Sequence, residues 1–276
     1  MTVSPHANST CRPHWSVART WLLQPGLPGF TVTDEPHVDV VVLDIEDGLP
    51  AAAKAEGRRA VADWLHDGGN AWVRINSAAT SEWDADLRAL SSAAGLAGVM
   101  LAKTESADDV VATAARLPAG TPIVALVESA LGIESALEIA RCCSRIAFGV
   151  GDFRRDTGMS ADPMVLAYPR ARLVIASRAA GLPAPIDGPT LRDQSRHLAR
   201  ETDVAKAAGM TGRLCLDVTH AETINTLLSP SVMEIDEARR TLARLDDPAG
   251  VYDGSAGPTR SRAEAVLALA AKLGVL

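Results

Sequence analysis

The sequence predicts an α/β fold, a TIM-type (β/α)8 barrel followed by a C-terminal helical extension. Eight short apolar runs alternate with longer amphipathic stretches along most of the 276 residues, which is the pattern of repeated βαβ units with a parallel sheet. The runs lack strict apolar–polar alternation, as expected of strands covered on both faces. Eight repeats fit a closed barrel better than an open sheet. No G-x-G-x-x-G follows an early run, which argues against dinucleotide binding.

The predicted elements follow in chain order. Strands are expected where the short apolar runs lie, at residues 21–23, 38–43, 71–75, 98–101, 123–127, 146–150, 185–186 and 213–216. Helices are expected where apolar residues recur with helical spacing, at 51–66, 84–94, 107–117, 131–142, 162–180, 191–208, 221–228, 232–245 and 261–273, with a loop at 246–258. The chain is therefore predicted to comprise a loose N-terminal leader (1–18), the barrel (19–228) and the extension (229–276).

Composition argues against several classes of protein. The net charge is −7 and the arginines are scattered among carboxylates, so the basic stripe of a nucleic-acid binder is missing. No run of 18 apolar residues is present to span a membrane, and residues 1–15 are polar, unlike a signal peptide. The four cysteines form neither a disulfide framework nor a zinc spacing, which favours a reducing compartment. We expect a cytoplasmic protein that binds a small molecule.

Polar residues follow the apolar runs at the end where a barrel places its active site. In a (β/α)8 barrel, catalytic side chains stand at the carboxyl ends of the strands. The residues in these positions are Asp44, Glu46, Asp47, Arg74, Asn76, Lys103, Glu105, Glu128, Gly151, Asp152 and Asp187. A single Asp after a strand is often only a helix N-cap, but several polar residues at equivalent positions favour a functional site.

Glu128 and Asp152 are the most informative pair, because each follows a strongly apolar run and the two runs are neighbours. Carboxylate oxygens suit Mg²⁺, with Mn²⁺ as the alternative, and Mg²⁺ uses one or two protein carboxylates together with water and substrate oxygens. We therefore predict a metal site at these two residues, and we expect Gly151 and Asp152 to contact the substrate. The alternative interpretation is that Glu128 caps the next helix and that Asp152 pairs with Arg154 or Arg155.

Arg74 offers a planar fork that fits a substrate carboxylate. We predict catalytic roles for Arg74, Glu46 and Asp47, in which Arg74 binds substrate and the two carboxylates hold metal waters or orient the guanidinium. The alternative is that Arg74 forms only a salt bridge to Glu46 or Asp47. Lys54, one turn into the next helix, is expected to pair with one of these carboxylates.

Several blocks of the sequence resemble the HpcH/HpaI aldolase family, and in particular its citrate lyase beta-subunit-like members. The blocks, in order, are RTWLL (19–23), VLDIEDG (42–48), VRIN (73–76), MLAKTES (100–106), VESALG (127–132), FGVGDF (148–153) and SPS (229–231). The resemblance covers about residues 19–245 and consists of many short motifs in the same order.

The resemblance implies a barrel in which Glu128 and Asp152 hold Mg²⁺ and Arg74 binds the carboxylate of an oxo acid. It also implies that carbon–carbon bonds are made or broken in malyl-, citramalyl- or citryl-type thioesters or in aldol adducts of pyruvate. A metal chelated by a 2-oxo acid is a suitable Lewis acid for such chemistry. The resemblance further implies a homotrimer, or a hexamer built from trimers. We expect the C-terminal extension to contact another subunit.

The sequence departs from the family's pattern at three places. CLDV stands at 215–218 where the family has Cys-Ile-His-Pro, residues 24–35 contain no basic residue for a CoA phosphate, and DGSAGP at 253–258 lacks the final Asp of the family's C-terminal motif. These departures leave the metal and oxo-acid residues in place and count against a CoA thioester as substrate.

The sequence therefore predicts a metal-dependent carbon–carbon lyase or aldolase that acts on an oxo acid or its acyl-CoA adduct. The alternative is a diverged, catalytically weak member that binds a small carboxylate metabolite in a structural or regulatory role. A third interpretation is a carboxyl- or phosphoryl-transfer enzyme of the phosphoenolpyruvate type. It is disfavoured because His220, near the eighth strand, is more typical of a capping or packing residue than of a nucleophile.

Overall fold

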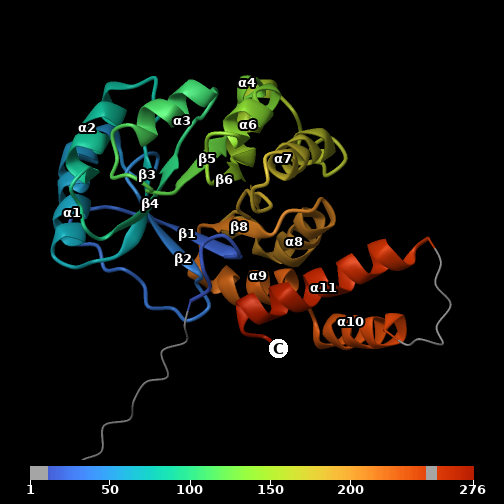
Figure 1. Ribbon diagram of the computed structural model, residues 1–276. Coiled ribbons are helices and arrows are strands. Elements are labelled where there is room, and N and C mark those ends of the chain that lie inside the picture. The colour runs from blue at the N-terminus through green and yellow to red at the C-terminus, as the bar shows by residue number, and fades with distance from the viewer. Residues whose placement is uncertain (1–11, 247–253) are drawn as a thin grey trace, which may run out of the picture.

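The computed structural model describes residues 12–246 and 254–276, and it confirms the predicted (β/α)8 barrel. Eight parallel strands close in chain order, so that β8 pairs with β1 (Figure 1). The strands are β1 (Thr20–Pro25), β2 (Val40–Asp44), β3 (Ala71–Ile75), β4 (Leu96–Leu101), β5 (Ile123–Val127), β6 (Arg145–Phe148), β7 (Ile186–Asp187) and β8 (Gly212–Cys215).

Helices surround the barrel and continue beyond it. Those between the strands are α1 (Lys54–His66), α2 (Ser81–Leu90), α3 (Ala107–Ala114), α4 (Ala130–Glu134), α5 (Ala136–Ala140), α6 (Val150–Thr157), α7 (Ala167–Ala179) and α8 (Leu198–Ala207). After β8 come α9 (Ala221–Leu228), α10 (Val232–Leu245) and α11 (Ala256–Leu273). Short 3-10 helices lie at Ala51–Ala53, Arg192–His197 and Val218–His220.

Two apolar layers explain why the strands read as continuous apolar runs. One layer fills the barrel interior and includes Trp21, Val42, Met100 and Leu126. The other lies between the strands and the helices and includes Leu43, together with many residues from the facing helices. Successive residues of a strand point to opposite faces, and here both faces are buried. Apolar residues are therefore needed at every position rather than at alternate ones.

The region after β5 differs from the sequence prediction. The single helix expected at 131–142 is two short helices, α4 and α5, which meet at Ser135 with φ −82° and ψ 5°. The strand expected at 146–150 ends at Phe148, and α6, which the sequence did not predict, begins at Val150. The helix α6 ends at Gly158 in the left-handed conformation and buries only Phe153, so it lacks the apolar stripe from which a helix is recognised in a sequence.

The C-terminal helices pack on one another and on their own chain. The helices α10 and α11 are in contact, and Figure 1 shows them beside α9. The last turns of α11 share a cavity with residues near the start of β1, including Ser16 and Val17. Most of the predicted loop 246–258 lies outside the described residues, but α11 begins at Ala256, earlier than expected, because a proline is tolerated in the first turn of a helix. The contact of this extension with another subunit stays a prediction.

No helix within residues 12–246 and 254–276 combines the length and the apolar character needed to cross a membrane.

Arg145 closes the amino-terminal end of the barrel. It lies on β6, is fully buried, and donates hydrogen bonds to the carbonyls of Trp15, Ala18 and Ala184 at 2.8–3.0 Å and to the Thr211 hydroxyl at 3.0 Å. Burial lowers the pKa of the guanidinium, but four acceptors surround it. Residues 15 and 18, which the sequence assigned to the loose leader, are thereby fixed to the barrel.

Replacing Arg145 by Met should lower the free energy of unfolding by about 2–4 kcal/mol, because several buried acceptors lose their donor. Urea unfolding followed by tryptophan fluorescence measures this change. Arg141→Met is the matched control, since Arg141 is exposed and its replacement should change the stability by less than about 0.5 kcal/mol. Equal unfolding midpoints for the two variants would contradict the assigned role.

Candidate active site

Charged side chains gather at the carboxyl ends of β2 to β6, the end at which such barrels carry out their chemistry. One cavity of about 250 Å³ lies there, lined by Lys103, Glu105, Glu128, Ser129, Asp152, Arg155 and Asp156. Glu46 and Arg74 adjoin this cavity, because Glu46 is paired with both Lys103 and Arg74. The structure thus brings together most of the polar residues that the sequence placed after the second to sixth strands.

Glu128 directly follows β5, and only 6% of it is exposed. One of its carboxylate oxygens accepts a hydrogen bond from the backbone N–H of Lys103 at 2.8 Å. The N-cap of α4 is Ser129, whose hydroxyl accepts from the N–H of Gly132. The interpretation of Glu128 as a helix cap is therefore wrong, and its carboxylate faces the cavity.

Asp152 lies in the first turn of α6 and lines the same cavity as Glu128. Its carboxylate is 3.0 Å from Nη2 of Arg155, so the ion pair considered as an alternative is present with Arg155, whereas Arg154 donates to the carbonyl of Met159. The Arg155 side chain is 73% exposed, and exposed ion pairs contribute only about 0–1 kcal/mol. Pairing with Arg155 therefore leaves Asp152 available to a ligand.

The surroundings of Glu128 favour a bound cation. Burial raises the pKa of Glu128 to about 8, and repulsion from Asp152 and Glu46 acts in the same direction. A cation beside the two carboxylates would offset both effects. The pair fits Mg²⁺, which takes one or two protein carboxylates and completes its shell with water or substrate oxygens. In the described part of the chain no three His, Cys, Asp or Glu residues form a metal-binding group, so most ligands of such a cation would come from outside the protein.

Two glycines leave space for the buried carboxylates. A Cβ atom on Gly149 would lie 2.3 Å from Oε2 of Glu128, and one on Gly48 would lie 2.5 Å from Oδ2 of Asp44. Gly149 has an ordinary φ of −84°, so glycine is needed here for space and not for its conformational freedom. The residue that follows β6 therefore determines whether Glu128 can occupy its place.

The guanidinium of Arg74 binds the neighbouring carboxylate of Asp44. Its Nε and Nη2 donate to the two oxygens of Asp44 at 2.9 and 2.5 Å, and its Nη1 is 3.3 Å from Glu46. The sequence suggested Glu46 or Asp47 as its salt-bridge partner, but the main partner is Asp44. The register explains this, because Asp44 and Arg74 lie opposite each other on β2 and β3. Burial by itself would lower the pKa of Arg74, but the hydrogen bonds and charge of Asp44 outweigh it and the pKa is raised.

Glu46 and Asp47 differ in their surroundings. Glu46 is buried and paired with Lys103 and Arg74, while Asp47 is half-exposed and lies 3.5 Å from the ammonium of Lys103. Although partial burial opposes it, Lys103 lowers the pKa of Asp47. The prediction that Lys54 pairs with one of these carboxylates is wrong. Its ammonium donates to the backbone carbonyl of Glu46 at 2.9 Å and to Oδ1 of Asn76 at 2.6 Å.

Lys103 is central to the site, although no role was predicted for it from the sequence. Its ammonium contacts Glu46, lies 3.5 Å from Asp47 and 3.9 Å from Asp152, and its backbone N–H binds Glu128. Its φ of 49° is the one positive value outside glycine among the described residues, and such backbone strain is concentrated at functional sites. The signal in the sequence was a lysine at the end of a strand between two acidic strand ends.

Other predicted residues lie away from this cavity. Gly151 does not join Asp152 there, because it lines a separate cavity on another side of α6. Asp187 ends β7 but is buried against Arg170 at 3.1 Å. His220 is buried and shares a hydrogen bond of 2.8 Å with the hydroxyl of Ser195, which agrees with a packing role.

The architecture and the strand-end residues agree with a match in sequence. The family model described as HpcH/HpaI aldolase/citrate lyase matches residues 33–218. The chain belongs to this family. The resemblance found in the sequence motifs is thereby confirmed.

Individual relatives of the HpcH/HpaI family give the range of similarity. The chain is 35% identical over 187 residues to a citrate lyase subunit beta-like protein of Mycobacterium tuberculosis. This match covers 68% of this chain and 58% of the relative. It is 30% identical over 259 residues to a (3S)-malyl-CoA thioesterase of Cereibacter sphaeroides, covering 84% of this chain and 89% of the relative. A crystal structure of CitE from Mycobacterium tuberculosis in complex with magnesium, acetoacetate and coenzyme A has a TM-score of 0.75 at 28% identity, and covers 93% of this chain and 99% of that one.

The burial of Glu128 predicts how the stability of the metal-free protein depends on pH. Because the pKa of Glu128 is raised from 4.5 to about 8 on folding, its protonated form stabilises the fold fully below pH 4.5. That contribution, on the order of a few kcal/mol, is lost as the pH rises to about 8. Glu128→Gln keeps an acceptor for Lys103 and removes this loss. Its stability relative to the unmodified protein should therefore increase between pH 5 and pH 8.

Urea unfolding in the presence of EDTA at pH 5, 6.5 and 8 measures this difference. Glu105→Gln is the matched control, because it removes another carboxylate from the same cavity. If the stabilities of Glu128→Gln and the unmodified protein run parallel across this range, the carboxyl of Glu128 is not in the environment described.

Proposed function

We propose that this member of the HpcH/HpaI family is a Mg²⁺-dependent carbon–carbon lyase or aldolase that acts on an oxo acid or on its acyl-CoA adduct. The observation that carries the proposal is that Glu128 and Asp152 line one cavity at the strand ends, with Lys103 between them and the Glu46–Arg74 pair beside them. Similar proteins crystallised with magnesium and acetoacetate, or with magnesium and oxaloacetate, support the assignment of metal and substrate class.

The carboxylates of Glu128 and Asp152 would hold the cation. A divalent cation in that place would act as a Lewis acid and stabilise the negative charge that develops on a 2-oxo acid as the carbon–carbon bond breaks. Because Glu128 is buried, water would be excluded from the side of the reacting molecule that faces it. Gly149 would keep the space that Glu128 needs.

Two cationic side chains would bind the substrate carboxylates. Lys103 lines the cavity and 37% of its side chain is exposed, so its ammonium can turn from Glu46 toward an anionic ligand. Arg74 is less exposed, at 11%, and is held by Asp44. Only Nη1 of Arg74 is not bound to Asp44, and this nitrogen would take the carboxylate. Asp44 and Glu46 would fix the direction of the guanidinium.

The use of CoA is the second part of the proposal. The match to a malyl-CoA thioesterase and to a structure that contains coenzyme A favours an acyl-CoA adduct, while the absence of basic residues from 24–35 argues for a free acid. Incubation with malyl-CoA and with the free hydroxy acids, with and without Mg²⁺, tests both. Release of an oxo acid or of acetyl-CoA indicates a lyase, release of free thiol alone indicates a thioesterase, and binding without turnover indicates the catalytically weak alternative.

A homotrimer and a cytoplasmic location stay predictions.

Asp152→Asn should remove most Mg²⁺ binding, and with it cleavage of the carbon–carbon bond, because the cation would lose one of its two protein carboxylates. Isothermal titration with Mg²⁺ and the product-release assay measure the two effects. Asp156→Asn is the matched control, since it removes the same charge from the same cavity. Equal Mg²⁺ affinity in the two variants would contradict the assignment of Asp152 as a metal ligand.

Arg74→Lys should weaken oxo-acid binding by about 1.5–3 kcal/mol, the usual contribution of a hydrogen bond to a charged group, while Mg²⁺ affinity changes little. Oxaloacetate titrated into the unmodified protein and the variant, with and without Mg²⁺, measures the change. Arg58→Lys is the control, because Arg58 is also a buried arginine, paired with Glu82 and Asp86. A lower melting temperature with unchanged oxaloacetate affinity in Arg74→Lys would leave Arg74 only a structural role.

A further inference from the structure

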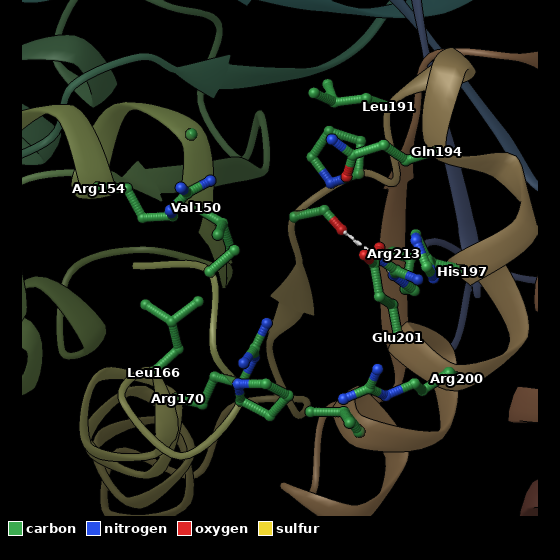
Figure 2. A pocket seen from close by; sticks show the side chains of 16 residues that line it. Val150, Arg154, Leu166, Arg170, Leu191, Gln194, His197, Arg200, Glu201 and Arg213 are labelled. Carbon is green, nitrogen blue, oxygen red and sulfur yellow. Dashed lines mark hydrogen bonds and ion pairs between the residues drawn. The ribbon is translucent and has the colours of Figure 1, made fainter. Parts of the chain in front are cut away.

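A second and larger cavity, of about 360 Å³, lies between α7 and α8, beyond the carboxyl end of β7 (Figure 2). Its volume is within the range of pockets that hold small metabolites. Its walls include residues that follow β6 and β7, so it opens toward the carboxyl end of the barrel. In many (β/α)8 barrels, anionic groups of ligands bind near the loops that follow the seventh and eighth strands.

The cavity between α7 and α8 concentrates positive charge in an acidic protein. Four arginines line it, Arg154, Arg170, Arg200 and Arg213, and the one carboxylate among its lining residues is Glu201. The whole chain has a net charge of −7, so this excess of cations is local. Guanidinium groups close together on the wall of a cavity repel one another, and an anion between them removes that repulsion.

Three of these arginines keep donors for a ligand. Arg170 is 8% exposed and binds Asp187 through Nε alone, and no hydrogen bond from its Nη atoms occurs in the described part of the chain. Arg154 uses Nε on a backbone carbonyl, and within the described residues neither Arg154 nor Arg200 has a carboxylate partner. Figure 2 shows the side chains of these three arginines reaching toward one space from different walls.

Arg213 has another role. It is 2% exposed, and its donors bind the carbonyl of Gly188 at 2.8 and 3.2 Å and the hydroxyl of Thr202 at 2.9 Å. It therefore forms the fixed back wall of the cavity. The rest of the lining is largely apolar and includes Leu166 and Val204 on facing helices, which suits a ligand that carries a short hydrocarbon part.

The helix α6 separates this cavity from the one that contains Glu128. Val150, Gly151 and Arg154 line the larger cavity, while Asp152 and Arg155 line the smaller one. At 3.6 residues per turn, the two sets are centred on different faces of the helix, about 120° apart. A ligand in the larger cavity therefore does not need the carboxylate pair.

We propose that the cleft between α7 and α8 binds a small organic oxyanion, a carboxylate or a phosphate ester, at a site separate from the Glu128–Asp152 pair. Each guanidinium group donates two parallel hydrogen bonds, the geometry that both kinds of oxyanion accept. The fixed donors of Arg170 provide the buried end of the site, and Arg154 and Arg200 close over the ligand.

Isothermal titration of the full chain at low ionic strength with EDTA present, using succinate and glycerol 3-phosphate as probes, tests this proposal. At least one probe should bind, and the tighter one identifies the carboxylate or the phosphate class. Arg154→Ala and Arg200→Ala should each weaken its affinity about tenfold, and the double variant about a hundredfold. Arg239→Ala, which removes a half-exposed arginine of α10, is the matched control and should leave the affinity unchanged.

Asp152→Asn distinguishes the two sites, because it alters the smaller cavity alone. Unchanged oxyanion affinity in Asp152→Asn together with loss in the double arginine variant supports the proposal. The proposal is overturned if neither probe binds, if both arginine variants bind as tightly as the unmodified protein, or if the affinity follows Asp152 instead. Circular dichroism of each variant checks that it is folded, and Arg200→Lys, which keeps the charge, should retain part of the affinity.

Discussion

The structure at the carboxyl end of the barrel depends on the pairing of buried carboxylates with two cationic side chains, Arg74 and Lys103. Asp44, Glu46 and Glu128 are all buried within a short stretch of strand ends, and three such charges together would repel one another strongly in a medium of low dielectric constant. Arg74 compensates Asp44 and Glu46, and Lys103 compensates Glu46. Glu128 receives only a backbone N–H from its nearest donor. Glu128 is therefore the buried carboxyl of this group without a paired cationic side chain, and a divalent cation would fill that position.

The two ends of the barrel solve the problem of burying charge in different ways. At the amino-terminal end, Arg145 is buried among neutral acceptors, which satisfy its hydrogen bonds and leave nothing for a ligand to replace. At the carboxyl end, charges are paired with one another, and side chains such as Lys103 are partly exposed. The first arrangement is fixed by buried hydrogen bonds to neutral groups, and the second leaves a charged surface that solvent can reach. This contrast agrees with the general division of such barrels into a stabilising end and a catalytic end.

The sequence was sufficient to predict the barrel, because burial on both faces of the strands requires continuous apolar runs, and those runs are visible by themselves. It also located Glu128 and Asp152, because side chains that follow parallel strands converge at one end. It did not reveal α6, which buries only Phe153, or the break between α4 and α5. It missed Lys103 and Asp44 as partners in the charge network, since pairings across β2, β3 and β4 depend on strand register, which apolar runs do not define. Lys54 was assigned to a carboxylate for the same reason, although backbone carbonyls and Asn76 lie closer to it.

The contact between Gly149 and Glu128 also limits how this chain can change over time. A Cβ atom at position 149 would lie 2.3 Å from Oε2 of Glu128 and 2.5 Å from its Cβ. Shortening the side chain at position 128 therefore does not make room, because every residue except glycine keeps that Cβ atom. Without a shift of the backbone, position 149 stays closed to substitution whether or not position 128 carries a carboxylate. A chain that lost Glu128 would thus still carry the glycine, and a single substitution back to glutamate would restore the pair.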